Sequence, residues 1–331
     1  MTGALEVTAP GGVGEIVAGD DLAALVLEAF SAVGGLRDGD IVTVTSKVVS
    51  KAEGRTVAGT REDALPGETV RVVARRGPTT IVRNRQGLTM AAAGIDGSHV
   101  APGQVLLLPE DPDASARAIR HALVEASGAC VGVLLTDTAG RAWREGQTDL
   151  AIGAAGVTVL ESFAGKADTH GNELAVTEPA VADELAAAVE LASGKLGGRP
   201  FARVRGRADL VLPADDDGPG AAALVRPDGG DLFGLGTREA VVAALAGRDA
   251  GVFGARALAE DLGHAVADVL GGRVEVGDAR VTTHLSDAAG REVEAAETIG
   301  FAFGWEPEVT ATFDAKGRPS GIRVRFLPAG P

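Results

Sequence analysis

The chain has 331 residues, of which 45% are apolar and 23% charged, a composition typical of globular proteins and unlike that of disordered chains. The net charge of −15 argues against a general binder of nucleic acids or of anionic membranes, and the single cysteine, Cys130, excludes an intrachain disulfide framework and a cysteine-built zinc site. Because no apolar run reaches about 18 residues and no export signal is recognisable, we expect a cytoplasmic protein without a membrane span.

The first half of the chain is expected to alternate helices with strands. Residues 20–34 predict a helix, since Asp20 or Asp21 can cap its start and Gly34 and Gly35 can stop it. A β-branched strand is predicted at 41–46, and 70–85 predict two strands around a turn. Three further predicted elements are a strand at 104–109, a helix opening at 111–113 and a buried strand at 131–136.

The second half changes character near residue 240. Before it, 177–193 predict an alanine-rich helix that Thr177 caps, with Pro179 in the first turn. After it come two alanine-rich helices, at 237–246 and 252–270, and then short alternating segments typical of strands. We therefore predict an α+β (mixed α/β) protein of two parts, a main domain at 1–240 and a small α+β extension at 241–331.

Side chains suited to metal and phosphate chemistry occur at strand ends and in glycine-bearing loops. The patterns of phosphate loops, dinucleotide folds, GxSxG hydrolases and HExxH metalloproteases are absent from the sequence. Asp96 lies in the loop GIDGS, and Asp137 and Thr138 follow a fully apolar strand. Two carboxylates and a hydroxyl suit Mg²⁺ or Mn²⁺, and Lys47 and Lys51 could neutralise phosphate. The alternative is that each acid only caps a turn.

A far more specific signal comes from five segments that occur in a fixed order: TSKVVSKAEGR (45–55), AAAGIDGSHV (91–100), TDTAGRAWREGQTDLAIG (136–153), GNELAVTEPAVADELA (171–186) and DLFGLGTREA (231–240). They closely resemble the coenzyme F-420-0:L-glutamate ligase family, and especially the N-terminal ligase half of its actinobacterial two-domain form. The similarity covers about residues 5–240. It implies an F-420 gamma-glutamyl ligase-like fold, mixed α/β and without a P-loop, assembled as a homodimer.

The resemblance also implies roles for individual residues. Asp96 and Asp137 match ligands of one divalent metal, and Thr138 matches a contact of a second. His99 stands where the family usually has asparagine, a departure that bears on nucleotide affinity or choice because histidine cannot offer both a carbonyl and an amide. The positions that match nucleotide contacts are Val13, Gly14, Glu15, Ile16, Ser46, Lys51, His99, Arg205 and Gly206.

The implied reaction adds L-glutamate, γ-linked and once or several times, to the deazaflavin coenzyme F-420-0. GTP phosphorylates the carboxylate of the coenzyme, the amine of glutamate attacks the acyl phosphate, and GDP and phosphate leave. The implied ions are Mg²⁺ or Mn²⁺ at two sites, with K⁺ as an optional further ion. Lys51 would neutralise phosphate charge, and Arg141 or Arg144 would bind a substrate carboxylate or phosphodiester. The alternative for both arginines is surface pairing with Glu145 and Asp149.

Residues 241–331 depart from the two-domain relatives. Those proteins continue into a longer, FMN-dependent, nitroreductase-like domain, whose arginine-rich signature this stretch lacks. We therefore predict no FMN, and we expect a packing or dimerisation appendage. Two other functions stay open, an amide ligase for a different acceptor and a non-catalytic regulator that binds nucleotide.

Overall fold

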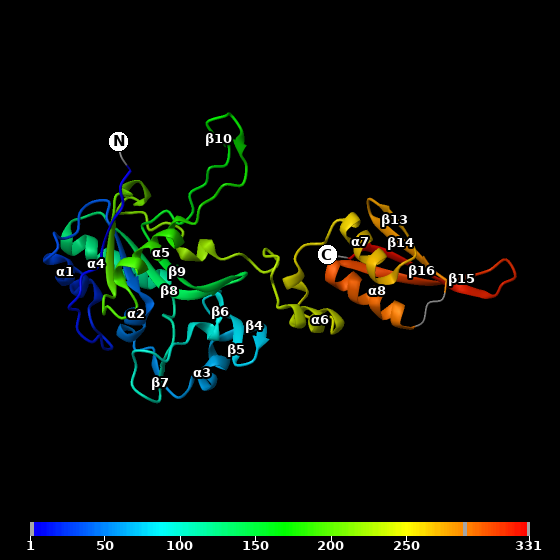
Figure 1. The fold of residues 1–331 in the computed structure, drawn as a ribbon, viewed down its shortest axis with the longest axis horizontal. Helices are drawn as coiled ribbons and strands as arrows, with labels where there is room; N and C mark the ends of the chain where they lie inside the picture. Colours follow the sequence, from blue (N-terminus) through cyan, green and yellow to red (C-terminus); the bar gives the residue numbers. More distant parts are fainter. Residues whose placement is uncertain (1–2, 287–289, 330–331) are drawn as a thin grey trace. The chain divides into compact units, whose positions relative to one another are not determined.

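The computed structural model describes residues 3–286 and 290–329, and the chain divides into two compact units, Met1–Val225 and Arg226–Pro331 (Figure 1). Both units combine helices with sheets that are mostly antiparallel, which confirms the predicted α+β class. The boundary that the sequence predicts at residue 240 falls within α6 (Thr237–Leu245), a helix of the second unit. None of the helices in the two described ranges combines the length and apolar composition that a bilayer crossing requires.

A five-stranded sheet forms the centre of the first unit. Within this sheet only β2 and β8 run parallel, in a register that pairs Thr45 with Thr136 where both strands reach the same edge. The residues that follow, Ser46 and Asp137, are therefore brought together at that edge. The strand order is β1 (Glu6–Thr8), β12 (Phe201–Arg205), β2 (Ile41–Thr45), β8 (Gly132–Arg141) and β9 (Arg144–Ala155).

Helices cover both faces of this sheet. On one face, α1 (Leu22–Ser31) and α4 (Pro112–Ser127) share a core with Val42 of β2. On the other face, α5 (Val181–Ser193) shares a core with the neighbouring Ile41. Strand β2 is thus apolar on both sides, as expected for a strand buried between two helical layers.

Helix α5 begins later than the sequence predicts. Its first residue is Val181, so Thr177 does not cap it and Pro179 precedes its first turn. The carbonyl oxygens of Thr177 and Pro179 instead accept hydrogen bonds from the backbone N–H groups of Phe163 and Glu161, both at 3.0 Å. The backbone of this stretch is thereby paired with another segment and is not available to start a helix.

A smaller layer of the first unit, residues 56–107, has its own core. Its buried residues are Val82, Ala93, Ile95, Val105 and Leu107. The two strands predicted within 70–85 are present here, whereas the strand predicted at 104–109 already ends at Leu106. The elements of the layer are β3 (Thr56–Ala58), α3 (Arg61–Glu68), β4 (Thr69–Arg76), β5 (Thr79–Asn84), β6 (Thr89–Ala91), η1 (Ala92–Gly94) and β7 (Gln104–Leu106).

The remaining elements of the first unit are short. A hairpin of two small strands projects from it (Figure 1). The elements are α2 (Ser46–Ala52), β10 (Lys166–Ala167), β11 (Glu173–Leu174), η2 (Ala208–Leu210) and η3 (Ala221–Leu224).

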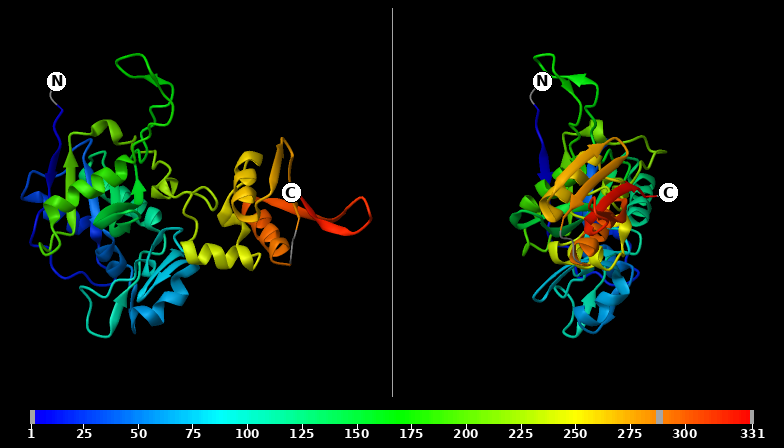
Figure 2. Two further views of the ribbon diagram at one scale, coloured as in Figure 1. Left: turned by 45° about the vertical axis from the view of Figure 1, so that its right-hand side comes forward. Right: turned by 90° about the vertical axis from the view of Figure 1, so that its right-hand side faces the viewer.

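The second unit is a four-stranded antiparallel sheet with two helices packed on it (Figure 2). The helices α7 (Ala259–Leu270) and α8 (Gly290–Phe303) contact each other and share one core with the sheet. The strand order is β13 (Arg273–Gly277), β14 (Arg280–Leu285), β16 (Pro319–Pro328) and β15 (Trp305–Phe313), and α6 and η4 (Ala250–Phe253) precede α7 in the chain.

Two helices of this unit differ from the prediction. The helix expected at 252–270 begins only at Ala259, and α8 was not predicted at all. Gly300 lies inside α8, where a Cβ atom would come within 2.5 Å of the Trp305 carbonyl oxygen. The stretch 291–297 is rich in glutamate and alanine, which favour a helix, and the missing Cβ atom of Gly300 lets α8 lie close to the backbone of β15.

Arg120 of α4 ties a loop of the first unit to the helix. Its side chain is completely buried, and its guanidinium donates to Asp217 Oδ1 at 2.7 Å and to the carbonyl oxygens of Pro213 at 2.7 Å and Asp216 at 3.1 Å. A buried guanidinium with these partners holds residues 212–217 against α4, because losing the cation would leave several carbonyl groups without donors and the Asp217 carboxylate with His121 alone.

We expect Arg120→Ala to lower the free energy of unfolding by about 3 kcal/mol or more, since it leaves buried acceptors unpaired. Urea unfolding followed by circular dichroism measures the change. Arg117→Ala is the matched control on the same helix, where the exposed Arg117 guanidinium lies 4.0 Å from Asp111. Equal stability losses in the two variants would contradict the anchoring role of Arg120.

Candidate functional site

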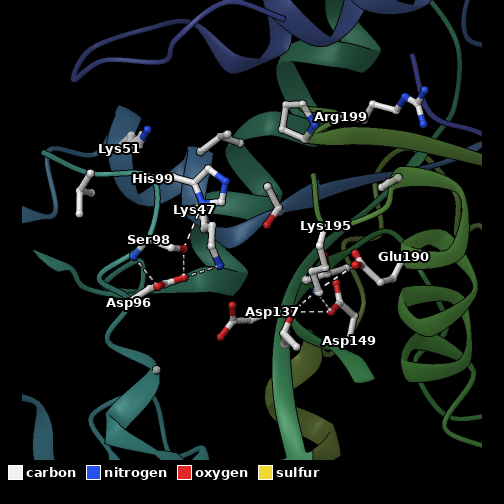
Figure 3. Close-up of a pocket in the computed structure, with 18 of the residues that line it drawn as sticks. Lys47, Lys51, Asp96, Ser98, His99, Asp137, Asp149, Glu190, Lys195 and Arg199 are labelled. Atoms are coloured by element: carbon white, nitrogen blue, oxygen red, sulfur yellow. Dashed lines mark hydrogen bonds and ion pairs between the residues drawn. The ribbon is translucent and has the colours of Figure 1, made fainter. Parts of the chain in front are cut away.

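An open cavity of about 980 Å³ lies where β2 ends beside Thr136 of β8. Its walls come from the loop at 13–16, from α2, from 90–101 of the smaller layer, from β8 and β9, and from the end of α5 with the loop after it. Segments far apart in the sequence therefore face one space (Figure 3).

Asp137 lies on the β8 wall of the cavity. It is only 8% exposed, and its Oδ1 accepts a hydrogen bond from Ser46 Oγ at 3.0 Å. Burial raises the pKa of Asp137 to about 6, while the nearby charge of Lys47 and the Ser46 hydroxyl act in the opposite direction. The fold therefore keeps a carboxylate where water solvates it poorly.

Asp96 lies on the opposite wall, next to the ammonium group of Lys47 at 2.6 Å (Figure 3). Ser98 also donates to Asp96, from its backbone N at 2.7 Å and from Oγ at 2.9 Å. Burial alone would raise the pKa of Asp96, but these donors outweigh it and the pKa is lowered. Lys47 thus lowers the pKa of both Asp96 and Asp137. His99 also lines the cavity, with Nδ1 3.0 Å from Ser98 Oγ.

The turn that delivers Asp96 depends on Gly94. The φ angle of Gly94 is +79°, a conformation that L-residues other than glycine rarely adopt. A Cβ atom at Gly94 would also lie 2.6 Å from Leu108 Cδ1. Gly94 of the GIDGS loop is therefore favoured both by its backbone conformation and by the lack of space for a side chain.

A second polar cluster occupies the β9 side of the cavity. Thr138 donates from Oγ1 to Asp149 Oδ1 at 2.6 Å, because the hairpin register sets these residues opposite each other. Lys195 places Nζ 2.6 Å from Thr138 Oγ1, 3.2 Å from Asp149 Oδ1 and 2.9 Å from Glu190 Oε1. Although partial burial disfavours the charge, the hydrogen bond to Glu190 and the charge of Asp149 raise the pKa of Lys195.

The predicted nucleotide loop meets Lys51 in the same cavity. Val13, Gly14, Glu15 and Ile16 all line it. The Lys51 ammonium forms an ion pair with the Glu15 carboxylate, and the Lys51 side chain is 12% exposed. The loop and the lysine, more than thirty residues apart in sequence, are thus held together by a direct charge contact.

Arg205 and Gly206 are not brought to the cavity. Strand β12 runs antiparallel to β2, so its cavity end is Phe201, and Arg199 and Pro200 line the cavity instead. Arg205 lies at the other end, where its guanidinium binds both carboxylate oxygens of Asp40 at 2.7 Å. A nucleotide role for Arg205 and Gly206 stays a prediction.

Arg141 and Arg144 are also outside the set of residues that line the cavity. Both are exposed at the end of the β8–β9 hairpin, and Arg141 Nη2 donates to the Glu145 carbonyl oxygen at 3.4 Å. Asp149, the suggested partner of these arginines, instead contacts Thr138 and Lys195. Their predicted role in substrate binding is not tested by this geometry.

Glu190 and Lys195 were not predicted as site residues, Asp149 was considered only as a surface partner of arginine, and Lys47 only as a possible neutraliser of phosphate. Two signals could have found them. A hairpin of β8 with β9 sets Asp149 opposite Thr138. The chain also has only five lysines, so each one is an unusual choice in this composition.

The side chains on the two walls fit a divalent cation of the Mg²⁺ or Mn²⁺ type at one place. Asp96 and Asp137 offer carboxylate oxygens, the donors that these hard cations prefer, and phosphate oxygens commonly complete such a site. Within 3–286 and 290–329, no group of three or more histidine, cysteine, aspartate or glutamate side chains is close enough to hold an ion alone. The further oxygen ligands of a cation held by Asp96 and Asp137 would come from water, hydroxyl groups or a bound nucleotide.

We expect Asp137→Asn to stabilise the protein in metal-free buffer at pH 8. The folded-state pKa of about 6 lies above the ordinary aspartate value, so the ionised carboxylate destabilises the fold by about 3 kcal/mol at high pH and not below pH 4. The gain in Tm of the variant should shrink as the pH falls from 8 to 5, as measured by thermal unfolding with EDTA.

The control for this experiment is Asp168→Asn in the exposed hairpin. Hydrogen bonds from Asn172 and from backbone N–H groups lower the pKa of Asp168, so its replacement should bring no gain at pH 8. An Asp137→Asn variant that is less stable than the parent at pH 8 without metal would contradict the proposed cost of this buried charge.

Comparison with known proteins assigns the chain to a family. The family described as F420-0:Gamma-glutamyl ligase matches residues 12–63 and 63–206. The chain is 39% identical over 239 residues to the coenzyme F420:L-glutamate ligase of Methanopyrus kandleri, covering 65% of this chain and 92% of that protein. It is 36% identical over 238 residues to the ligase of the same name from Methanothermobacter thermautotrophicus, covering 65% of this chain and 93% of that protein. The chain belongs to the F420-0:gamma-glutamyl ligase family.

Proposed function

We propose that this chain joins L-glutamate to the deazaflavin coenzyme F420-0, with GTP as the phosphoryl donor. Relatives that align over most of their length are named coenzyme F420:L-glutamate ligase, which supports the acceptor and the amino acid. The observation that carries the proposal is the single cavity in which Asp96 and Asp137 face Lys47 and Lys51. Carboxylates beside cations suit a nucleoside triphosphate with its divalent ion.

The proposed chemistry solves a problem common to amide-forming ligases, since a carboxylate is a poor electrophile. An oxygen of the coenzyme carboxylate attacks the terminal phosphorus of GTP, and GDP leaves, which gives an acyl phosphate. The amine of glutamate then attacks the acyl carbon. The bond from that carbon to the phosphate oxygen breaks, phosphate departs, and the proton of the amine passes to solvent.

The residues of the cavity divide this task between binding and charge neutralisation. Lys51, held by Glu15 beside the 13–16 loop, would neutralise nucleotide phosphates. Asp96 and Asp137 would hold a divalent cation, which supplies charge neutralisation and alignment of the phosphates when bound. Lys47 would move from Asp96 towards phosphate oxygens as that ion binds, because the Lys47 ammonium and the divalent ion compete for the Asp96 carboxylate.

The second unit takes no part in these proposed steps. A packing or dimerisation role for residues 241–331 and the lack of FMN remain predictions from the departure of this stretch from the two-domain relatives, and the homodimer remains a prediction from the family resemblance. Acceptors other than the deazaflavin, and a regulator that binds nucleotide without turnover, are outcomes that the following experiment distinguishes.

We expect glutamyl adducts of coenzyme F420-0 when the protein is incubated with L-glutamate, GTP and Mg²⁺ or Mn²⁺, and mass spectrometry will count the glutamates added. Lys51→Met should lower kcat/KM for GTP at least about a hundredfold, because an ammonium that meets developing phosphate charge is lost. Lys316→Met, at an exposed lysine of the second unit, is the matched control and should retain full activity. GTP binding with no adduct would favour the regulator, and full activity of Lys51→Met would exclude its proposed role.

A further inference from the structure

Five lysine and arginine side chains line the cavity, and they fall into two groups. The three lysines, Lys47, Lys51 and Lys195, each form an ion pair with a carboxylate that also lines it. Within 3–286 and 290–329, the two arginines, Arg61 and Arg199, form no ion pair, and each donates instead to one backbone carbonyl oxygen. The cavity therefore contains two cations that carboxylates of the fold do not pair.

The helix beside Arg199 explains the position of this arginine. Arg199 Nη1 donates to the carbonyl oxygen of Ala192 at 3.3 Å, and Ala192 lies in the last turn of α5. A cation is favoured at this end of a helix, because the free carbonyl groups there carry partial negative charge. Arg199 thus has a structural role that needs no ligand.

Arg61 has the opposite position in its own helix. It is the first residue of α3, where the free N–H groups of the helix start disfavour a cation. The nearby Asp63 carboxylate does not offset this charge by contact, because it accepts hydrogen bonds from the backbone N and the Oγ1 of Thr60 at 2.9 and 2.7 Å. The helix therefore gives no electrostatic reason for an arginine at this place.

One hydrogen bond holds the Arg61 guanidinium at the cavity wall. Its Nε donates to the carbonyl oxygen of Ile95 at 3.0 Å, and Ile95 is a buried residue directly before Asp96. Because Nε is engaged, the end of the guanidinium with Nη1 and Nη2 is left, and these atoms have no acceptor among the described residues. Two such nitrogens form a fork that suits the two oxygens of a carboxylate or of a phosphodiester.

The proposed function requires cations for more anions than the nucleotide. Lys47, Lys51 and the divalent ion already serve the phosphates of GTP in that proposal. L-Glutamate brings two carboxylates, and the coenzyme brings a carboxylate and a phosphodiester. Arg141 and Arg144, which the sequence suggests for these groups, are outside the set of residues that line the cavity. Arg61 lines it and has a free fork.

We propose that Arg61 is a substrate-binding residue, whose Nη1–Nη2 fork holds a carboxylate or phosphodiester of L-glutamate or of the coenzyme on the Asp96 side of the cavity. The inference rests on the proposed function, because it takes the two substrates from it. An anionic group held beside Asp96 brings its substrate to the wall where the divalent ion and the phosphates are proposed to bind, which favours the orientation that phosphoryl transfer needs.

The experiment compares Arg61→Gln with the wild type in steady-state glutamylation of coenzyme F420-0. Glutamine can still donate to the Ile95 carbonyl oxygen but lacks the charge and the fork. We expect KM to rise at least about tenfold for L-glutamate or for the coenzyme, and KM for GTP to stay within about twofold of the wild type. Arg61→Lys keeps the charge without the fork, so its KM should lie between the two. The substrate whose KM rises is the one that Arg61 binds.

The matched control is Arg76→Gln, at an exposed arginine of the same smaller layer that lies outside the cavity, and its KM values should equal those of the wild type. Circular dichroism establishes that each variant is folded. Calorimetry of GDP binding with Mn²⁺ should give wild-type affinity for Arg61→Gln, which shows that the Asp96 loop is undisturbed. Unchanged KM values for both L-glutamate and the coenzyme would overturn the inference. So would a loss of GDP affinity as large as the rise in KM, since it would assign Arg61 to the nucleotide.

Equilibrium dialysis of L-glutamate and of coenzyme F420-0, with GDP and Mg²⁺ present, separates this inference from the proposed function. A wild type that binds the coenzyme without forming adducts, and an Arg61→Gln variant that does not bind it, would support the role of Arg61 and contradict the ligase. A wild type that forms adducts, and an Arg61→Gln variant with the same KM values, would support the ligase and contradict the role of Arg61. A wild type that binds neither substrate would contradict both.

Discussion

The parallel pairing of β2 with β8 is the constraint on which the site depends. These strands reach the same edge of the sheet together, with Thr45 paired to Thr136. The residues after this pair, Ser46 at the start of α2 and Asp137 within β8, are therefore adjacent, and Ser46 donates a hydrogen bond to Asp137. The helices on both faces bury the two strands, and a shift of one strand past the other would disrupt packing in both cores. A packing requirement thus determines where the polar chemistry lies.

Charge balance is the second principle of the cavity. Most carboxylates on its walls form an ion pair with an ammonium group: Asp96 with Lys47, Glu15 with Lys51, and Asp149 and Glu190 with Lys195. Asp137 is the exception, because it lacks an ion pair at contact distance among those that the structure describes, and burial raises its pKa. Destabilised groups of this kind are common at functional sites, where a ligand and not the fold supplies the missing partner.

Local signals in the sequence predicted Lys51, Asp96 and Asp137, which the structure brings to one cavity, because each lies beside a strand or in a glycine loop. Contacts between distant segments escaped prediction, as with Lys195 and Thr138, which are 57 residues apart. The start of α5 was wrong because Thr177 pairs with another segment, whereas α8 was missed although its glutamate and alanine residues favour a helix. Sequence patterns report neither kind of long-range contact.

The central claim is that this cavity activates a carboxylate by phosphorylation and then forms an amide. It is tested most directly with coenzyme F420-0 whose terminal carboxylate carries ¹⁸O, incubated with the protein, GTP, L-glutamate and Mg²⁺. If the carboxylate oxygen attacks phosphorus and later leaves with it, the released phosphate carries one ¹⁸O from the coenzyme. Unlabelled phosphate alongside the glutamyl product would contradict an acyl-phosphate path in this protein.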